Sequence, residues 1–472
     1  MHIIGRSKEI ELLNEKLASE KPEFVALYGR RRIGKTYLVR NVFEYKFTFR
    51  ITGVAQATLQ EQLANFNIAM QEQHPQAGHK STNNWMEAFQ QIKQVVEKSK
   101  QKKKIIFIDE LPWFDTAHSR FIPALEHFWN SWASNRKDVL LVVCGSAASW
   151  MINKLINNKG GLHNRVTQRL KIEPFTLNEC QDLLKHKKMT LEHYQLIQLY
   201  MALGGIPFYW DAIKKGMSAS QHINKLCFEA NGLLKDEFNN LFKSLFAKAE
   251  RHEAIVTALA KKSKGLTREE ISKESKIPTG GNFTDLLVEL EESGFIRRYI
   301  PFGKQSRNSL YQLCDFFTLF HIKFIKGQKT FDKNHWLNMT DSPKRRAWSG
   351  YAFEQVCLAH IPQIKKALGI SGIETETSSW KSTQSKDGAQ IDLVIDRRDG
   401  VINLCEMKFS ISQFIINTKY DVELRNKVGA FRTETQTKKS IFLTMFTTYG
   451  LRDNSYAGNV QNDFKMDILF AD

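Results

Sequence analysis

Short apolar runs alternate with amphipathic stretches through the first 175 residues. Residues 24–28, 105–108 and 139–144 are almost wholly apolar, a pattern typical of strands buried on both faces of a parallel sheet. Polar residues or glycine follow each run at once, and ligands of open α/β sheets bind at the carboxyl ends of the strands. We therefore expect an α/β domain over residues 1–175 with its ligand site at that edge of the sheet.

The periodicity becomes helical and amphipathic from residue 177 to about residue 248. Gly204, Gly205 and Pro207 interrupt this pattern, as glycine and proline commonly do at helix boundaries. The segment 176–248 is therefore expected to form a set of short helices, which suits a helical lid on the preceding domain.

Residues 249–330 combine helix and strand signals. The expected elements are, in order, a helix over 252–261, a helix over 267–275 that starts with the capping box Thr267 to Glu270, a third helix that ends at Glu292, and strands over 295–301 and 309–313. Three helices followed by a hairpin predict a winged helix-turn-helix, whose wing would be the segment 303–307.

The remaining segment, residues 336–472, contains a β-hairpin signal. Residues 391–395 alternate and are rich in apolar side chains, Asp399-Gly400 favours a tight turn, and residues 403–408 form a second strand-like run. We expect a second α/β domain here.

A phosphate-binding loop follows the first apolar run. It has the pattern GxxxxGK[ST] and consists of Gly29, Arg30, Arg31, Arg32, Ile33, Gly34, Lys35 and Thr36. In such a loop the backbone N–H groups surround phosphate oxygens, the lysine reaches the β and γ phosphates, and the hydroxyl of Thr36 contacts Mg²⁺. A strand before the loop and a helical stretch after it supply the required context, so a nucleoside triphosphate with Mg²⁺ is the expected cofactor.

Two carboxylates end the second apolar run. Asp109 would bind the Mg²⁺ of the nucleotide, and Glu110 would act catalytically by polarising the attacking water. Ser146, at the end of the third run, would contact the γ phosphate, although a serine is also ordinary in a strand-to-helix turn.

Several motifs together resemble the archaeal-type ATPase family, within the AAA+/STAND group of P-loop NTPases. They are Ile4-Gly5-Arg6 with Glu9, the phosphate loop, Asp109-Glu110 with Trp113, Gly145-Ser146, the run from Leu162 to Arg169 before Pro174-Phe175, and Gly204-Gly205-Ile206-Pro207. The resemblance implies ATP as the nucleotide, with Arg6 beside the adenine. It also implies that Arg165 or Arg169 serves a neighbouring subunit as an arginine finger, the alternative being a surface arginine. No sensor-2 arginine is evident near Gly204.

The C-terminal hairpin carries a second group of ionisable residues. Glu406 and Lys408 stand two apart on one expected strand and so share a face, and Asp392 lies on its partner strand. This resembles the PD-(D/E)xK nuclease arrangement and the nuclease-like domain that accompanies archaeal-type ATPases, with Ile391 in place of the leading proline. The resemblance implies catalysis by Asp392, Glu406 and Lys408, Mg²⁺ bound by Asp392 and Glu406, and Glu354 closing the acidic cluster. An inert domain that only holds DNA is the alternative.

The expected winged helix favours DNA binding without sequence reading. Its third helix is acidic, whereas the wing side carries Arg297, Arg298, Lys304 and Arg307, which could neutralise phosphates. A winged helix that only packs domains together is the alternative.

The overall charge points to the same class of partner. The 472 residues have a net charge of +18 and a pI near 9.4, which favours an anionic partner, first nucleic acid, here DNA, and second an acidic membrane surface. The six cysteines are widely spaced and are expected to be reduced. No apolar run is long enough to span a bilayer and no secretory leader is apparent, so we expect a cytoplasmic protein, without a membrane partner, that is compatible with a homo-oligomer.

The expected fold class is thus α/β, with an AAA+ P-loop core (1–175), a helical lid (176–248), a winged helix-turn-helix (249–330) and an α/β restriction-endonuclease-like domain (336–472). Two functions compete. One is an ATP-hydrolysing protein that binds DNA and cleaves it in the C-terminal domain. The other is an ATP-controlled switch or transcriptional regulator that binds DNA without cleaving it.

Overall fold

A computed structural model of the chain describes residues 3–78, 80–157, 160–246, 248–327, 332–384 and 388–471. The chain divides into two compact units, residues 1–174 and 175–472. The domain limits expected at residues 1, 330 and 472 lie outside the described residues.

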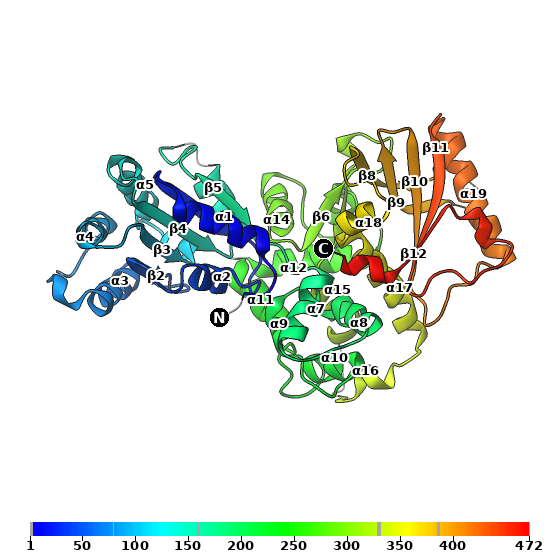
Figure 1. The fold of residues 1–472 in the computed structure, drawn as a ribbon, viewed down its shortest axis with the longest axis horizontal. Coiled ribbons are helices and arrows are strands. Elements are labelled where there is room, and N and C mark those ends of the chain that lie inside the picture. The colour runs from blue at the N-terminus through cyan, green and yellow to red at the C-terminus, as the bar shows by residue number, and fades with distance from the viewer. Residues whose placement is uncertain are drawn as a thin grey trace. The chain divides into compact units, whose positions relative to one another are not determined.

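The first unit is built on a five-stranded parallel sheet with the order β2-β3-β4-β1-β5 (Figure 1). Its strands are β1 (Glu23–Tyr28), β2 (Phe49–Thr52), β3 (Lys104–Asp109), β4 (Val139–Gly145) and β5 (Gln168–Lys171). The central strands β1, β3 and β4 contain the three apolar runs, and β4 is buried along its whole length. The predicted α/β core with a parallel sheet is confirmed.

Helices of the first unit follow the strands. They are α1 (Ser7–Ala18), α2 (Lys35–Val42), α3 (Leu59–Gln73), α4 (Trp85–Lys98), α5 (Phe121–Ser131) and the short α6 (Ala148–Trp150). One face of the sheet packs against an aromatic cluster from α3, α4, α5 and the short 3-10 helix Leu111–Phe114, in which the ring of Trp85 lies edge-on to Phe114 and Phe121 at 5.2 and 5.0 Å between centroids. Edge-to-face aromatic pairs add about 0.5–1.5 kcal/mol each to the energy of area burial. This core supports the strand ends that carry the phosphate loop.

The second unit begins with a group of short helices. They are α7 (Leu177–His186), α8 (His193–Leu203), α9 (Pro207–Asp211), α10 (Ala219–Cys227) and α11 (Glu237–Leu245). α8 packs against α15 (Phe316–Phe320) and α17 (Pro343–Ala359), where Tyr200 contacts the rings of Phe316 and His360. The helices expected over 176–248 therefore pack within the second unit.

Three helices and a two-stranded antiparallel sheet follow and form what we call the hairpin module, residues 249–313. Its elements are α12 (Ala249–Leu259), α13 (Arg268–Ser275), α14 (Gly281–Glu292), β6 (Ile296–Tyr299) and β7 (Leu310–Leu313). α13 starts with the predicted capping box, because Thr267 accepts a hydrogen bond from the Glu270 N–H and Glu270 accepts one from the Thr267 N–H.

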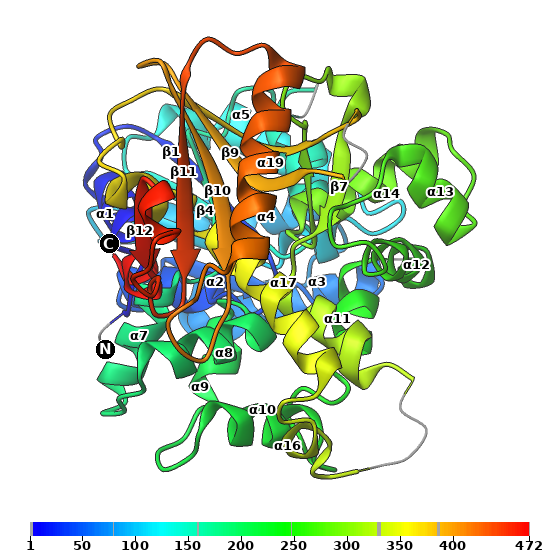
Figure 2. The ribbon, with the colours of Figure 1, turned by 90° about the vertical axis from the view of Figure 1, so that its right-hand side faces the viewer.

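The C-terminal sheet has five strands in the order β12-β11-β10-β9-β8. They are β8 (Thr375–Lys381), β9 (Gln390–Arg397), β10 (Val401–Lys408), β11 (Ser440–Thr447) and β12 (Asn462–Lys465). β8, β9 and β10 form an antiparallel meander, and β11 and β12 run parallel to β10. Helix α19 (Thr418–Thr435), which connects β10 to β11, covers one face of the sheet (Figure 2), where Phe431 packs on Trp380 at 5.2 Å.

Further helices of the second unit are α16 (His335–Asn338) and α18 (Ile361–Ala367). α17 contacts β10, so the buried residues Ala352, Phe353 and Val356 lie next to the C-terminal sheet. The six cysteines are free thiols, as expected. Within the described part of the chain, no helix combines the length and the apolar character needed to cross a bilayer.

Candidate functional sites

The phosphate loop occupies the turn between β1 and α2. Gly29 has φ 140°, and a Cβ at this position would lie 2.4 Å from the backbone oxygen of Ile172, so only glycine fits. Gly34 (φ 87°) is the N-cap of α2. Because backbone N–H groups at a helix start carry partial positive charge, this turn has the geometry of an anion site.

Lys35 lies at the centre of the loop. Its buried ammonium donates hydrogen bonds to the backbone oxygens of Gly29 and Arg30, both at 2.9 Å, and to Ser146 Oγ at 3.1 Å. Burial lowers the pKa of Lys35, while the nearby acidic groups Glu110 and Asp109 oppose that shift. The Lys35 ammonium is therefore held beside the loop by uncharged acceptors, two backbone oxygens and one hydroxyl.

The two carboxylates at the end of β3, Asp109 and the next residue Glu110, play different structural roles. Asp109 is buried and accepts a hydrogen bond from the Thr36 hydroxyl, and burial raises the pKa of Asp109 despite that bond. Glu110 follows with φ 49°, a left-handed conformation unusual for glutamate. Glu110 Oε1 accepts a hydrogen bond from Ser146 Oγ at 2.9 Å, and Oε2 accepts one from the Ser146 N–H at 3.3 Å. The structure thus brings Thr36 to Asp109, and Lys35 and Glu110 to Ser146.

Arg6 reaches the same loop. It is the N-cap of α1 in a left-handed conformation, its Nη2 donates to the backbone oxygen of Ile33 at 3.3 Å, and its Nη1 pairs with Glu9 at 3.6 Å. Arg30 and Ile33 are buried, Arg32 is half-buried with φ 69°, and Arg31 is exposed.

The two candidate finger arginines differ in setting. Arg165 is exposed in the turn before β5, and Arg169 is exposed within β5, opposite Ala26 of β1. Neither is hydrogen-bonded to the group formed by Lys35, Glu110 and Ser146 in the described contacts, so the finger role stays a prediction beside the alternative of a surface arginine.

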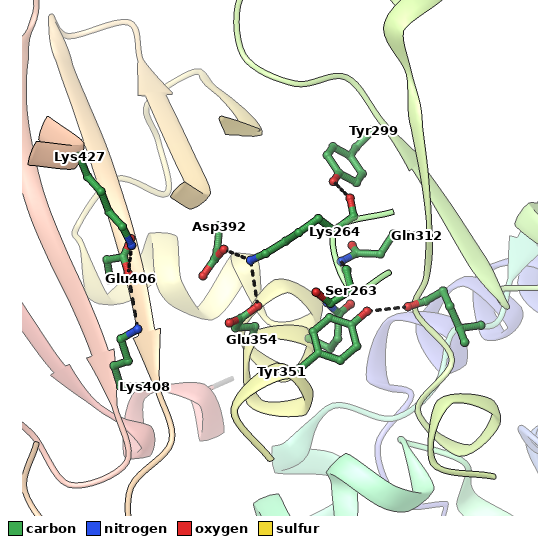
Figure 3. Close-up of polar contacts among 12 residues, drawn as sticks. Ser263, Lys264, Tyr299, Gln312, Tyr351, Glu354, Asp392, Glu406, Lys408 and Lys427 are labelled. Carbon is green, nitrogen blue, oxygen red and sulfur yellow. Dashed lines mark hydrogen bonds and ion pairs between the residues drawn. The ribbon is translucent and has the colours of Figure 1, made fainter. Parts of the chain in front are cut away.

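In the second unit the expected acidic cluster is divided between two lysines. Asp392 of β9 and Glu354 of α17 both pair with the Nζ of Lys264, Glu354 at 3.4 Å and Asp392 in a shorter contact (Figure 3). Burial, followed by the charge of Asp392, raises the pKa of Glu354 to about 7. Burial alone would lower the pKa of Lys264, but the two carboxylates outweigh it and raise the pKa.

Glu406 pairs with a different lysine, Lys427. It is buried on β10, and its two carboxylate oxygens lie 2.9 and 3.0 Å from Lys427 Nζ of α19. The Tyr420 hydroxyl donates to Glu406 Oε2 at 3.2 Å, and Lys408 Nζ lies 3.8 Å from the same oxygen. Burial raises the pKa of Glu406, and the charge of Asp392 adds to the shift, so the two carboxylates are neighbours without sharing a cation. In this structure Lys264 pairs with Asp392 and Glu354 while Lys427 pairs with Glu406, and binding of Mg²⁺ by these carboxylates stays a prediction.

Asp392 and Glu354 provide some of the ligands that a divalent ion needs. Among the described residues, no three His, Cys, Asp or Glu side chains form a group that could hold a metal ion. Asp392 and Glu354, however, direct oxygens at one cation, the Lys264 ammonium, and carboxylate oxygens are the ligands that Mg²⁺ prefers. Asp392 and Glu354 thus form a two-carboxylate position, and the neighbouring Glu406 pairs with Lys427 instead.

A cavity of about 830 Å³ opens beside this position. Strand β6 and the loop after it contribute Arg298 and Lys304 to its lining, and Glu354, Asp392 and Asp396 contribute carboxylates. Basic and acidic groups thus face one space, which is the arrangement that a phosphate-bearing ligand and a metal ion would need.

Arg297, expected among the cations that contact DNA, is instead committed to internal contacts. Its guanidinium donates to Gln312 Oε1 at 2.8 and 2.6 Å and to Gln355 Oε1 at 2.6 Å. Successive residues of a strand project to opposite faces, so Arg297 faces inward while Arg298 is exposed. Arg298, Lys304 and Arg307 remain as the exposed basic residues of the hairpin.

Lys264 and Lys427 are the site residues that the sequence analysis missed. Each pairs with a carboxylate far away in the chain, over 128 residues for Lys264 and Asp392 and 21 residues for Lys427 and Glu406. No local motif marks either lysine.

Comparisons with known proteins cover the chain unevenly. Residues 3–211 match a family described as "ATPase domain predominantly from Archaea". An uncharacterized protein of Methanocaldococcus jannaschii is 27% identical over 397 residues, which cover 83% of each chain. An uncharacterized ATP-binding protein of the same organism is 42% identical over 43 residues, 9% of this chain and 73% of that protein.

A similar fold occurs among solved structures. A Walker-type ATPase of Pyrococcus abyssi matches with a TM-score of 0.51 at 16% identity, covering 68% of this chain and 96% of that one. At this identity the likeness concerns the fold alone. It agrees with the α/β fold and parallel sheet of the first unit.

Proposed function

Because residues 3–211 belong to the family of ATPase domains found predominantly in Archaea, we propose that this protein hydrolyses ATP and uses the nucleotide to control the action of its second unit on DNA. The ATPase assignment is supported by the family and by the fold. The action on DNA is the new part of the proposal.

The roles in the nucleotide site follow from its contacts. Lys35, now bonded to two backbone oxygens and Ser146, would move its donors to the β and γ phosphates, which are stronger, charged acceptors. Thr36 and Asp109 would hold the Mg²⁺ that accompanies ATP and neutralises phosphate charge. Glu110 would orient the attacking water, since its carboxylate already lies at the strand end beside Ser146.

Other predicted residues would complete this site. The backbone N–H groups of residues 29–34 would surround the phosphates, Arg6 would lie beside the adenine, and Arg165 would reach the nucleotide of a neighbouring subunit. The contact of Arg6 with Ile33 supports its place next to the loop. A homo-oligomer is part of this proposal, because a finger acts on a partner's γ phosphate.

For the second unit we propose DNA binding by the hairpin module and cleavage beside the C-terminal sheet. Arg298, Lys304 and Arg307 are exposed cations on one hairpin and would hold phosphates without reading bases. α14 exposes Asp285 on its outer face, which disfavours its insertion into a groove.

The observation that carries the cleavage proposal is the convergence of Asp392 and Glu354 on one cation. These two carboxylates would hold Mg²⁺, which would activate water and stabilise charge on the phosphate. Lys408 would offset developing negative charge, and Glu406, paired with Lys427, would position Lys408 from 3.8 Å. The order helix α17, meander β8-β9-β10, helix α19 and strand β11 supports the resemblance to the PD-(D/E)xK arrangement.

An assay of DNA cleavage tests this proposal. Purified protein is incubated with plasmid and linear DNA in Mg²⁺ or Mn²⁺, beside Asp392→Asn and, as a matched surface control, Asp453→Asn. Cleavage lost only in Asp392→Asn supports the metal site. Binding without cleavage in every condition would leave the alternative, a non-catalytic DNA-binding switch under ATP control.

A further inference from the structure

The turn that carries Lys264 is fastened to the β6–β7 hairpin on both sides. The backbone oxygen of Ser263 accepts from Gln312 Nε2 at 2.6 Å, and that of Lys264 accepts from the Tyr299 hydroxyl at 2.5 Å (Figure 3). Leu266 and Tyr311 exchange two backbone hydrogen bonds of 2.9 and 2.8 Å. The backbone position of Lys264 is therefore set by the hairpin.

Glycine is required in the same turn. Gly265 has φ 83°, and a Cβ there would lie 2.6 Å from the backbone oxygen of Tyr311. This close approach keeps the turn against β7, and the Lys264 ammonium reaches Asp392 and Glu354 from there.

The hairpin is in turn tied to the elements that carry the carboxylates. The Phe302 N–H donates to the backbone oxygen of Ser379 on β8, an edge strand of the C-terminal sheet, at 2.7 Å. Arg297 donates to Gln355, the neighbour of Glu354 on α17, at 2.6 Å. Phe302 also packs on Phe431 of α19 at 5.1 Å between ring centroids. These contacts place Lys264 within reach of Asp392 and Glu354.

An ammonium and a divalent ion compete for such a position. Both need the carboxylate oxygens of Asp392 and Glu354, and a second positive charge within a few ångströms would be strongly repelled in a half-buried site. A lysine on a neighbouring turn can leave without unfolding either element, since its side chain is long and flexible.

We propose that Lys264 is an internal counter-ion that closes the metal position of the second unit. The divalent ion enters only when the Lys264 side chain withdraws from the two carboxylates. This inference rests on the proposed metal site, and it adds the step that regulates it.

The test measures Mn²⁺ binding to the full chain by calorimetry. Lys264→Met removes the competing charge and should tighten Mn²⁺ binding at least about tenfold relative to the wild type. Lys264→Arg keeps the charge and should bind as weakly as the wild type. Lys262→Met is the matched control, because Lys262 lies two residues away and pairs with Glu270 at 2.9 Å on the surface.

The outcomes separate this inference from the proposed function. The tightened binding should disappear when Asp392→Ala is added to Lys264→Met, and melting curves without metal establish that each variant is folded. If the wild type and Lys264→Met bind Mn²⁺ equally well and Asp392→Ala abolishes this binding, the metal site is supported. The same result would contradict the proposal that Lys264 competes with the metal ion. No Mn²⁺ binding in any folded variant would overturn both.

Discussion

Ser146 donates its hydroxyl hydrogen to Glu110 Oε1 at 2.9 Å, and the same hydroxyl accepts from Lys35 at 3.1 Å. The phosphate-binding lysine and the water-orienting glutamate are therefore joined through one side chain. A nucleotide that draws Lys35 to its phosphates changes the hydrogen bonding of Ser146, and through it the position of Glu110. This gives a short physical connection between ATP binding and readiness for hydrolysis.

Ser146→Ala should lower ATP turnover about tenfold, since the lost hydrogen bonds to charged groups are worth about 1.5 kcal/mol or more. ATP affinity should change much less, because Lys35 keeps its other contacts in the loop. Steady-state hydrolysis and nucleotide titration measure the two effects. Ser131→Ala, an exposed serine bonded to the His127 carbonyl, is the control. A variant with unchanged turnover would contradict the connection.

Lys35→Ala should weaken ATP binding roughly 10- to 150-fold, the value of one charge-assisted hydrogen bond of about 1.5–3 kcal/mol. Glu110→Gln should retain binding and lose about 10²–10⁴ in turnover, because it removes the group that orients water. Titration with a fluorescent ATP analogue and a phosphate-release assay measure both. Undiminished affinity in Lys35→Ala would show that the loop does not hold the phosphates.

Substitutions of the adjacent arginines Arg297 and Arg298 should have different effects on DNA binding. Removal of Arg298, Lys304 and Arg307 should reduce the slope of log affinity for DNA against log salt by about two to three. Arg297→Ala should leave that slope unchanged and lower stability, because its guanidinium is bonded to Gln312 and Gln355. Fluorescence anisotropy over a salt series and urea unfolding distinguish the two. A large decrease of the salt slope in Arg297→Ala would show that Arg297 contacts DNA phosphates and would contradict its internal role.

His360 should make the second unit less stable in mild acid. The buried imidazole accepts from the Leu177 N–H at 3.0 Å and donates to the Val356 oxygen at 2.8 Å, so it is neutral, and burial lowers the pKa of His360 to about 4. A folded-state pKa below the unfolded value near 6.5 stabilises the fold above pH 6.5, and that stability is lost as the pH falls toward 4.

Between pH 7.5 and 5 the loss from His360 is about 2 kcal/mol in the free energy of unfolding. His360→Gln should remove this part of the pH dependence, which urea unfolding at both pH values measures. His163→Gln, at an exposed position of the first unit, is the control. An unchanged pH dependence in His360→Gln would contradict the assignment.

The strands of the first unit could be predicted from the sequence because β1, β3 and β4 are apolar runs closed by glycine or carboxylates. The phosphate loop could be predicted because its chemistry needs glycine and lysine at fixed spacing. The sequence also contains information on the direction of Arg297. Adjacent residues of a strand project to opposite faces, so Arg297 and Arg298 could not both face solvent.

The pairing of the C-terminal carboxylates could not be predicted in the same way. The hairpin signal correctly places Asp392 and Glu406 on adjacent strands, but their partners Lys264 and Lys427 lie on a turn and a helix whose local patterns are those of surface lysines. Only the docking of the hairpin module and the packing of α19 bring these cations to the sheet.

ATP control of the second unit is the central claim, and the ATP dependence of its action on DNA tests it most directly. DNA cleavage and DNA affinity are measured with Mn²⁺, with and without ATP, for the wild type and Lys35→Ala. The account predicts that ATP changes cleavage or affinity in the wild type at least about threefold, a shift of about 0.7 kcal/mol, and changes neither in Lys35→Ala. Identical responses of the two proteins to ATP would contradict it.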